Sequence, residues 1–166
     1  LSSVQVSALT TNQVEALTVG QATQLTSTQS QGLTTSQTSA LESGDLNQLS
    51  TAAFAALSPS VVAKLSSVQV SALTTNQVEA LTTAQAYALT ATQAVGISAG
   101  QAPAVEGSDL SAMTTAGFAA LTEAAVAALT STQVGRLNTS EIEALTTVQA
   151  GALTAQQAQG LTTSQT

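Results

Sequence analysis

The chain of 166 residues contains no cysteine, histidine or tryptophan and is poor in charge. Only 2% of the residues are aromatic and 7% are charged, so an ordinary core built around large side chains is not expected. Without cysteine the chain can form neither disulfides nor thiolate metal sites. Catalysis needs a positioned base, nucleophile or metal, and the abundant Ser and Thr have no base to activate them. We therefore expect no enzymatic activity.

The same absences exclude several classes of partner. Haem needs an axial ligand, and only Tyr87 and Met113 could serve, of which Met113 fits better as a core residue. We expect no cofactor. Nine acidic residues against Lys64 and Arg136 give a net charge of −7, which would repel nucleic acid. The longest apolar runs, such as residues 52–57, are far shorter than the roughly 20 residues of a membrane span, so none is expected.

What the chain does contain is a period of eight residues. Leucine, or once each Ile97, Val105 and Met113, stands at every eighth position from Leu1 to Leu161 without a phase slip. Fixed self-similarity indicates a repeat architecture, whose units bury their apolar faces only by stacking on neighbours. A hydrophobic content of 43% argues against disorder. We predict one array of 21 octads over residues 1–166.

Each octad carries the signals of a new helix. Counted from the leucine, the consensus is L-[ST]-T-x-Q-V-x-A, with Ser or Thr at position two in 18 of 21 octads and Gln at position five in 14. Thr-x-x-Gln is a capping box, and the apolar residues at positions one and six suit a hydrophobic staple. Pro59 follows Ser58 at the first helical position, where proline is favoured. Val78 and the next leucine share one helical face.

This pattern predicts an all-α, narrow solenoid of capped helices, one per octad and six or seven residues long. A continuous helix is excluded because eight residues advance it by about 80° beyond two turns, so the leucine stripe would wind around the rod. A β-solenoid is the alternative, although Leu1, Val6 and Ala8 do not alternate with period two. The handedness and the number of helices per turn do not follow from the sequence.

A second period spans eight octads. Residues 1–64 match residues 65–128 at 38 of 64 positions without a gap, and residues 129–166 begin a third copy. Duplication explains this by history alone, and we favour it over a lateral contact that recurs every eight octads. The partial last octad and the missing polar end caps predict that the residues belong to a longer array, or that the next copy covers the ends.

Two acidic pairs are the only candidates for a metal site. Glu42 with Asp45, and Glu106 with Asp109, each place two carboxylates within four residues, which suits Ca²⁺. Two ligands are too few for a site, and carboxylates also favour helix N-termini, so we favour a capping role and no metal. Asn138 begins a glycosylation sequon, but a helix cap is the preferred interpretation.

The octads at residues 9–13 and 81–85, with the pattern Leu-Thr-x-x-Gln, resemble arrays in very large bacterial surface proteins described as adhesin-like or haem-utilisation-like. The resemblance covers the whole chain and implies an extracellular or cell-surface location. The haem function that this description implies is not expected, because the chain offers no suitable haem ligand. The motif is also similar to that of a periplasmic stress-chaperone family, but spacing of eight departs from that pattern and the function is not carried over.

The resemblance and the repeat together predict a structural protein, namely a rod, an adhesin stalk or a fibre subunit. Its expected partner is itself, end to end or laterally in a fibre. The alternative is a binding module that presents rows of Thr and Ala to a regular surface such as ice or carbohydrate.

Overall fold

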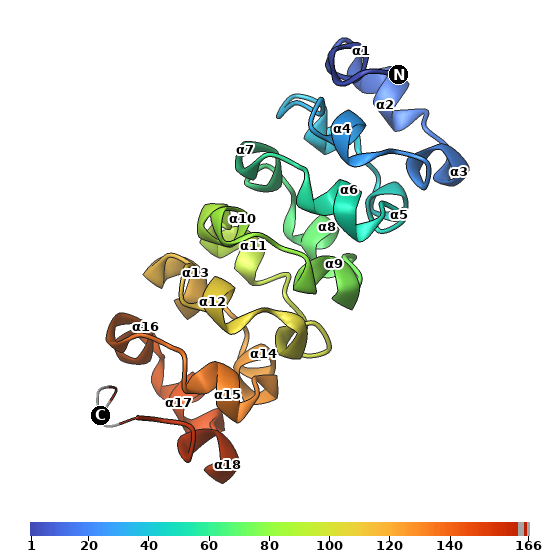
Figure 1. Cartoon of the computed structure of the whole chain (residues 1–166). Helices are drawn as coiled ribbons and strands as arrows, with labels where there is room; N and C mark the ends of the chain where they lie inside the picture. Colours follow the sequence, from blue (N-terminus) through green and yellow to red (C-terminus); the bar gives the residue numbers. More distant parts are fainter. Residues whose placement is uncertain (163–164, 166) are drawn as a thin grey trace.

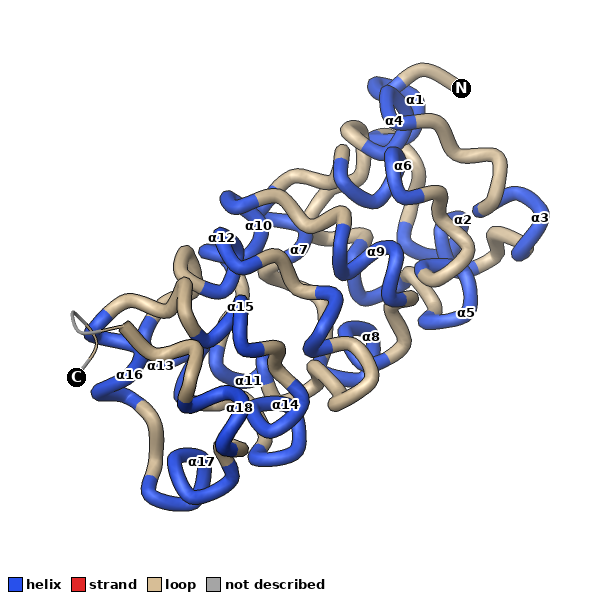
Figure 2. Tube along the Cα trace, turned by 60° about the horizontal axis from the view of Figure 1, so that its bottom comes forward, coloured by secondary structure: helices blue, strands red, loops and turns tan. Residues whose placement is uncertain are grey.

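In a computed structural model, which describes residues 1–162 and 165, the chain forms an elongated stack of short helices (Figure 1). Figure 2 shows the helices joined by short loops, and no strand occurs in the described residues. The α-helices and the two 3₁₀ helices are α1 Ser3–Ser7, α2 Thr11–Glu15, α3 Val19–Ala22, α4 Ser27–Ser30, η1 Thr38–Ala40, α5 Ser43–Leu46, α6 Thr51–Ala55, α7 Pro59–Val62, α8 Ser67–Ser71, α9 Thr75–Glu79, α10 Thr83–Ala88, α11 Ala91–Ala94, η2 Ala102–Ala104, α12 Gly107–Leu110, α13 Thr115–Ala119, α14 Glu123–Ala128, α15 Ser131–Val134, α16 Thr139–Ala144, α17 Thr147–Ala152 and α18 Ala155–Ala158.

The capping box sets where each helix begins. In α9 the Thr74 hydroxyl accepts from the Gln77 N–H at 3.2 Å, and the Gln77 Oε1 accepts from the Thr74 N–H at 3.0 Å. Reciprocal boxes of this kind begin twelve of the described α-helices. Ser58 caps α7 with Pro59 at its first position. The predicted all-α solenoid is confirmed, and the predicted caps are confirmed at these helices, whereas Glu42 and Glu106 precede α5 and α12 without a side-chain capping bond.

The predicted helix length is wrong, because the α-helices contain only four to six residues. The cap residue is extended, as at Thr74 with φ −70° and ψ 155°, and the leucine before it also lies outside the helix. These two residues carry the chain around the corner of the rod. Only the remaining positions are left for a helix, and the last of them form the turn into the next leucine. An isolated helix of this length would not be stable, so each depends on its neighbours.

Three octads make one turn of the solenoid. Helices pack against helices three octads away along the chain, as α7 does with α10 and α13 with α16. We call each turn of three octads a coil, and the rod therefore has three faces. The path of the chain through successive coils can be followed in Figure 1.

The core runs along the axis as one continuous cluster. Interior residues at positions one and six are buried, such as Leu73 and the fully covered Phe54. The two positions differ at the ends of residues 1–166. Val6 is buried in the first coil, whereas Ala150 at the same position is exposed near the other end, and the leucines are less buried at both ends, as at Leu153. Each position-six residue is thus covered by the following coil, and each leucine by the coils on both sides.

Candidate functional site

The glutamine at position five joins each coil to the one before it. Gln77 is 1% exposed, and while its Oε1 caps α9, its Nε2 donates to the carbonyls of Leu46 at 2.8 Å and Leu49 at 2.9 Å. These carbonyls precede Gln77 by 31 and 28 residues, and both belong to the previous coil. One amide therefore satisfies a helix cap and two carbonyl groups in the neighbouring coil. The two contacts with the previous coil are buried and the capping bond is partly buried, which makes their loss costly.

The same contact recurs along the rod, and we call it the glutamine ladder. Its members donate from Nε2 to the position-one carbonyl of the previous coil, and most also reach the position-six carbonyl before it, as Gln77 does. They are Gln29, Gln37, Gln69, Gln77, Gln85, Gln93, Gln101, Gln133, Gln149, Gln157 and Gln165.

Sequence reasoning recognised these glutamines as caps but missed their contact between coils. The signal that could have found it is the excess of Gln over Glu, since a capping box accepts either residue. When one side-chain oxygen is used in the cap, only the glutamine amide still has N–H groups that can donate to a further acceptor. The preference for Gln at position five therefore indicated an acceptor beyond the helix.

Four octads replace the ladder glutamine with an apolar or small residue. Position five is then buried Ala53, Val61, Gly117 or Ala125, and in two of these octads a fully buried phenylalanine follows. A Cβ on Gly117 would lie 3.2 Å from the Leu89 carbonyl oxygen. These coils pack closely without the amide, so burial of apolar side chains replaces hydrogen bonding there.

Acidic residues occupy the ladder position in three other octads. Asp45, Asp109 and Glu141 are all buried, with exposed fractions of 4%, 2% and 1%. Burial raises the pKa of Asp109, with a hydroxyl hydrogen bond from Thr83 lowering it and the charge of Glu106 raising it further. Burial likewise raises the pKa of Glu141, opposed by the backbone hydrogen bond from Asn138. The carboxylates of Asp109 and Glu141 each have one buried oxygen without a hydrogen-bond partner.

The structure places the two members of each candidate calcium pair in different surroundings. Glu42 and Glu106 are exposed N-cap residues of α5 and α12, without a side-chain capping bond, whereas Asp45 and Asp109 are buried in the first turn. No cluster of three acidic, His or Cys residues suited to a metal ion occurs in the part of the chain that the structure describes. The predicted cap at Asn138 is confirmed, since its side chain accepts from the Glu141 N–H at 3.0 Å.

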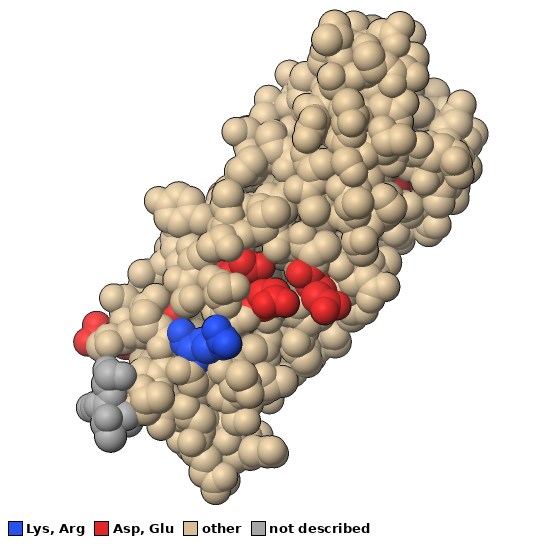
Figure 3. All heavy atoms as spheres, in the orientation of Figure 1, with Lys and Arg blue, Asp and Glu red and all other residues tan. Residues whose placement is uncertain are grey.

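The period of eight octads is out of phase with the coil. Eight octads are two full coils and two further octads, so equivalent features move to a different face of the rod at each repeat. Glu15 and Glu42 line one surface groove, and their equivalents Glu79 and Glu106 line another. The second groove also contains Arg136, and Figure 3 shows acidic side chains beside a basic one on a surface that is mostly uncharged. A lateral contact on one face would not recur every eight octads, which supports duplication as the origin of the period.

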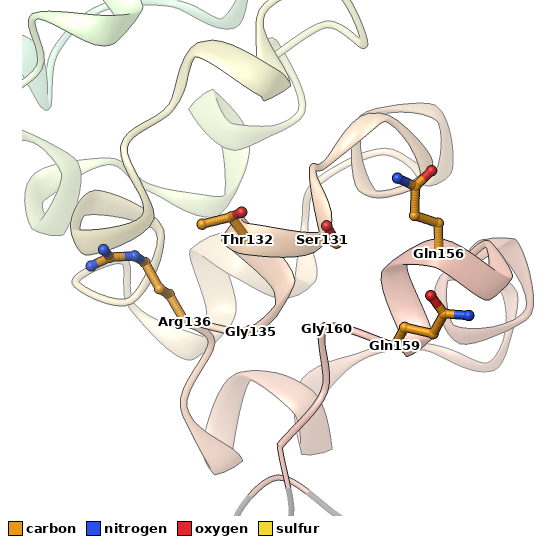
Figure 4. A pocket seen from close by; sticks show the side chains of 7 residues that line it. All are labelled: Ser131, Thr132, Gly135, Arg136, Gln156, Gln159 and Gly160. Atoms are coloured by element: carbon orange, nitrogen blue, oxygen red, sulfur yellow. The ribbon is translucent and has the colours of Figure 1, made fainter.

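The other grooves lie between successive coils, on different faces of the rod. One of them is lined by residues of α15, α18 and the turns after them, and its opening is seen in Figure 4. Arg136 lies on one side of it, while Gln156 and Gln159 lie on the other, and their side chains do not converge. Within the groove, Gly160 lies against the backbone of the previous coil, where a Cβ would come 2.2 Å from the Ser131 carbonyl oxygen. The groove is a seam between coils.

Position-three residues do not form a regular row of threonines. On the face that contains α1, α4 and α6, successive coils present Ser3, Ser27, Thr51, Thr75, Ala99, Glu123 and Thr147. The surface therefore changes from coil to coil in size, polarity and charge. Exposed aliphatic side chains occur on other faces as well, and two of them, Val68 and Val95, line one groove together.

No helix among the described residues has the length and apolar content needed to cross a bilayer. Comparison with curated proteins and with solved structures finds no significant match. The sequence matches the ALTTAQ repeat over residues 38–75, 54–83 and 102–139, which together are just over half of the chain. Both the helical octads and the tandem array agree with that match, and the chain belongs to the ALTTAQ repeat family.

Proposed function

We propose that this chain is a structural protein that forms a rod or filament outside the cell or on its surface, as an adhesin stalk or a fibre subunit, with no enzymatic role. The observation that carries the proposal is the glutamine ladder. Every rung repeats one contact between neighbouring coils, so the interface needs nothing besides the next coil of the same kind. An array built in this way can be extended without a change of interface.

The two ends of residues 1–166 are complementary. The first coil presents exposed Gln5, Gln13 and Gln21, which have no preceding coil within these residues. At the other end, the carbonyls of Leu145 and Leu153 occupy the acceptor position of the ladder, and Ala150 is exposed at position six. A further coil would satisfy both ends, whether the same polypeptide or a second copy supplies it. The low charge offers little repulsion to such a contact.

A rod accounts for the surface better than a binding module does. Ice or a crystalline carbohydrate would need the same side chain at each step along a face, and the position-three row is irregular. The ladder glutamines, by contrast, form their hydrogen bonds inside the rod, between neighbouring coils. We therefore propose lateral or end-to-end self-association as the main interaction.

Sedimentation velocity and negative-stain electron microscopy of residues 1–166 test the assembly. We expect particles of one width whose length increases with concentration. A variant with Gln5, Gln13 and Gln21 all changed to Glu loses three donors and gains three charges at one end, so it should remain short with an unchanged circular dichroism spectrum. Short particles for both proteins at all concentrations would argue against stacking of separate chains. Immunogold labelling of intact cells tests the location, and a label confined to the cell interior would contradict it.

A further inference from the structure

Glu141 stands at a ladder position but completes only half of the contact. Its Oε2 accepts from the Asn138 N–H at 2.7 Å, which is the capping half that ladder glutamines make with Oε1. Its Oε1 is buried and has no hydrogen-bond partner. The Gln77 amide donates to carbonyls 31 and 28 residues earlier in the chain. The same spacing from Glu141 leads to the carbonyls of Leu110 and Met113, so the unpaired Oε1 occupies the place of a donor to these two groups. The side chain is 1% exposed, so water does not replace the missing bond freely.

The chemistry of the carboxyl group decides whether this rung can form. An ionised carboxylate only accepts hydrogen bonds, and backbone carbonyls also only accept. When Glu141 is ionised, its negatively charged Oε1 therefore faces the partial negative charges of two carbonyl oxygens, and this contact is repulsive. When protonated, the same group has an O–H that can donate to one of the two carbonyls, as the glutamine amide does. We infer that Glu141 is a pH-sensitive joint between α16 and the turn that leads from α12 into α13, which forms its ladder rung in the protonated state and loses it on ionisation.

Burial, more than neighbouring charges, raises the pKa of Glu141. The helix packed against α16 is α13, and it carries no titratable residue. On α16 itself, Glu143 is exposed, and the acid nearest to the Leu110 carbonyl along the chain is Asp109. Desolvation raises the Glu141 pKa, and the Asn138 N–H that binds the ionised form lowers it in part. The folded chain therefore holds this proton more tightly than the unfolded chain.

The direction of the pH effect follows. A raised folded-state pKa gives a stabilisation that is complete below the ordinary glutamate pKa and is lost as the pH rises through the raised value. Asp109, at the ladder position four octads earlier, likewise has a buried unpaired Oδ2 and a pKa that is raised mainly by burial, although its hydrogen-bond partner is the Thr83 hydroxyl. Both acids therefore weaken the contact between coils in the same direction as the pH rises.

The test compares Glu141→Gln with Glu143→Gln, which removes the same charge from an exposed position of the same helix. Urea unfolding of the full chain is measured from pH 4 to pH 8. At pH 8 we expect Glu141→Gln to lower the unfolding equilibrium constant about tenfold, because it restores the consensus rung, and the gain should shrink as the pH falls. Glu143→Gln should have little effect at any pH.

Equal effects of the two substitutions across the pH range would overturn the inference. A second measurement on the unaltered chain is the carboxyl titration followed by nuclear magnetic resonance. Glu141 should titrate above the ordinary range of a glutamate carboxyl group, and a midpoint within that range would contradict the joint.

Discussion

Replacement of Gln77 by alanine measures what one rung of the ladder contributes. The substitution removes the capping bond to the Thr74 N–H and the two bonds to the carbonyls of Leu46 and Leu49. At about 1 kcal/mol for each of these three hydrogen bonds, the loss is about 3 kcal/mol of unfolding free energy. Urea unfolding followed by circular dichroism gives this value, and hydrogen exchange reports whether the coils on either side of α9 open first.

Two control variants separate the rung from the cap. Thr74→Ala removes only the hydroxyl that accepts from the Gln77 N–H, and should cost about 1 kcal/mol. Gln13 lies in an octad with the same eight residues, Leu-Thr-Thr-Asn-Gln-Val-Glu-Ala, but its side chain is exposed and makes the capping bond without a preceding coil. Gln13→Ala should also cost about 1 kcal/mol. If Gln77→Ala cost no more than these two variants, the contact between coils would contribute nothing and the reasoning would be refuted.

Further predictions concern packing and use the same unfolding assay. Leu73→Ala in the core should cost about 2 to 5 kcal/mol, whereas Thr75→Ala on the surface should cost little, and equal effects would show that the octad phase is wrong. Gly96→Ala should destabilise the chain, because its Cβ would lie 2.3 Å from the Ser67 carbonyl oxygen of the previous coil. Gly151→Ala, in helix α17 with open space around the new methyl group, should instead stabilise by up to about 1 kcal/mol, and a loss at this position would contradict the packing described.

The octad alone predicts the helices, their caps and their buried positions because those features are local. Thr74 and Gln77 lie within one octad, and their reciprocal bonds need no other part of the chain. The number of octads per coil depends instead on contacts between distant octads, such as that of Gln77 with Leu49 and Leu46. An eightfold period contains no information about that separation.

The longer period of eight octads also gives no hint of the coil, because eight octads are not a whole number of coils. What it does mark is close packing. Gly32, Gly96 and Gly160 recur at this spacing, and at each a Cβ would lie within 2.3 Å of a carbonyl oxygen in the previous coil. In the sequence these glycines replace the consensus Ala at position eight. Only the geometry between coils explains them.

Glu141 shows the same limit at the candidate site. Its side chain completes a capping box with Asn138, which the sequence predicts only as a cap. Its second carboxyl oxygen is unpaired and occupies the place that the glutamine amide fills in the other rungs of the ladder, so it weakens the contact between coils. A residue can therefore satisfy the local rule and still weaken the array.

The central claim is that three octads form one coil, held by amides that reach back to carbonyls of the previous coil. The most direct measurement is an experimental structure of residues 1–166 by crystallography or electron cryomicroscopy, at a resolution that shows side chains. We predict that the Gln77 amide lies between the carbonyls of Leu46 and Leu49. Two or four octads per coil, or an amide that points into solvent, would contradict the account.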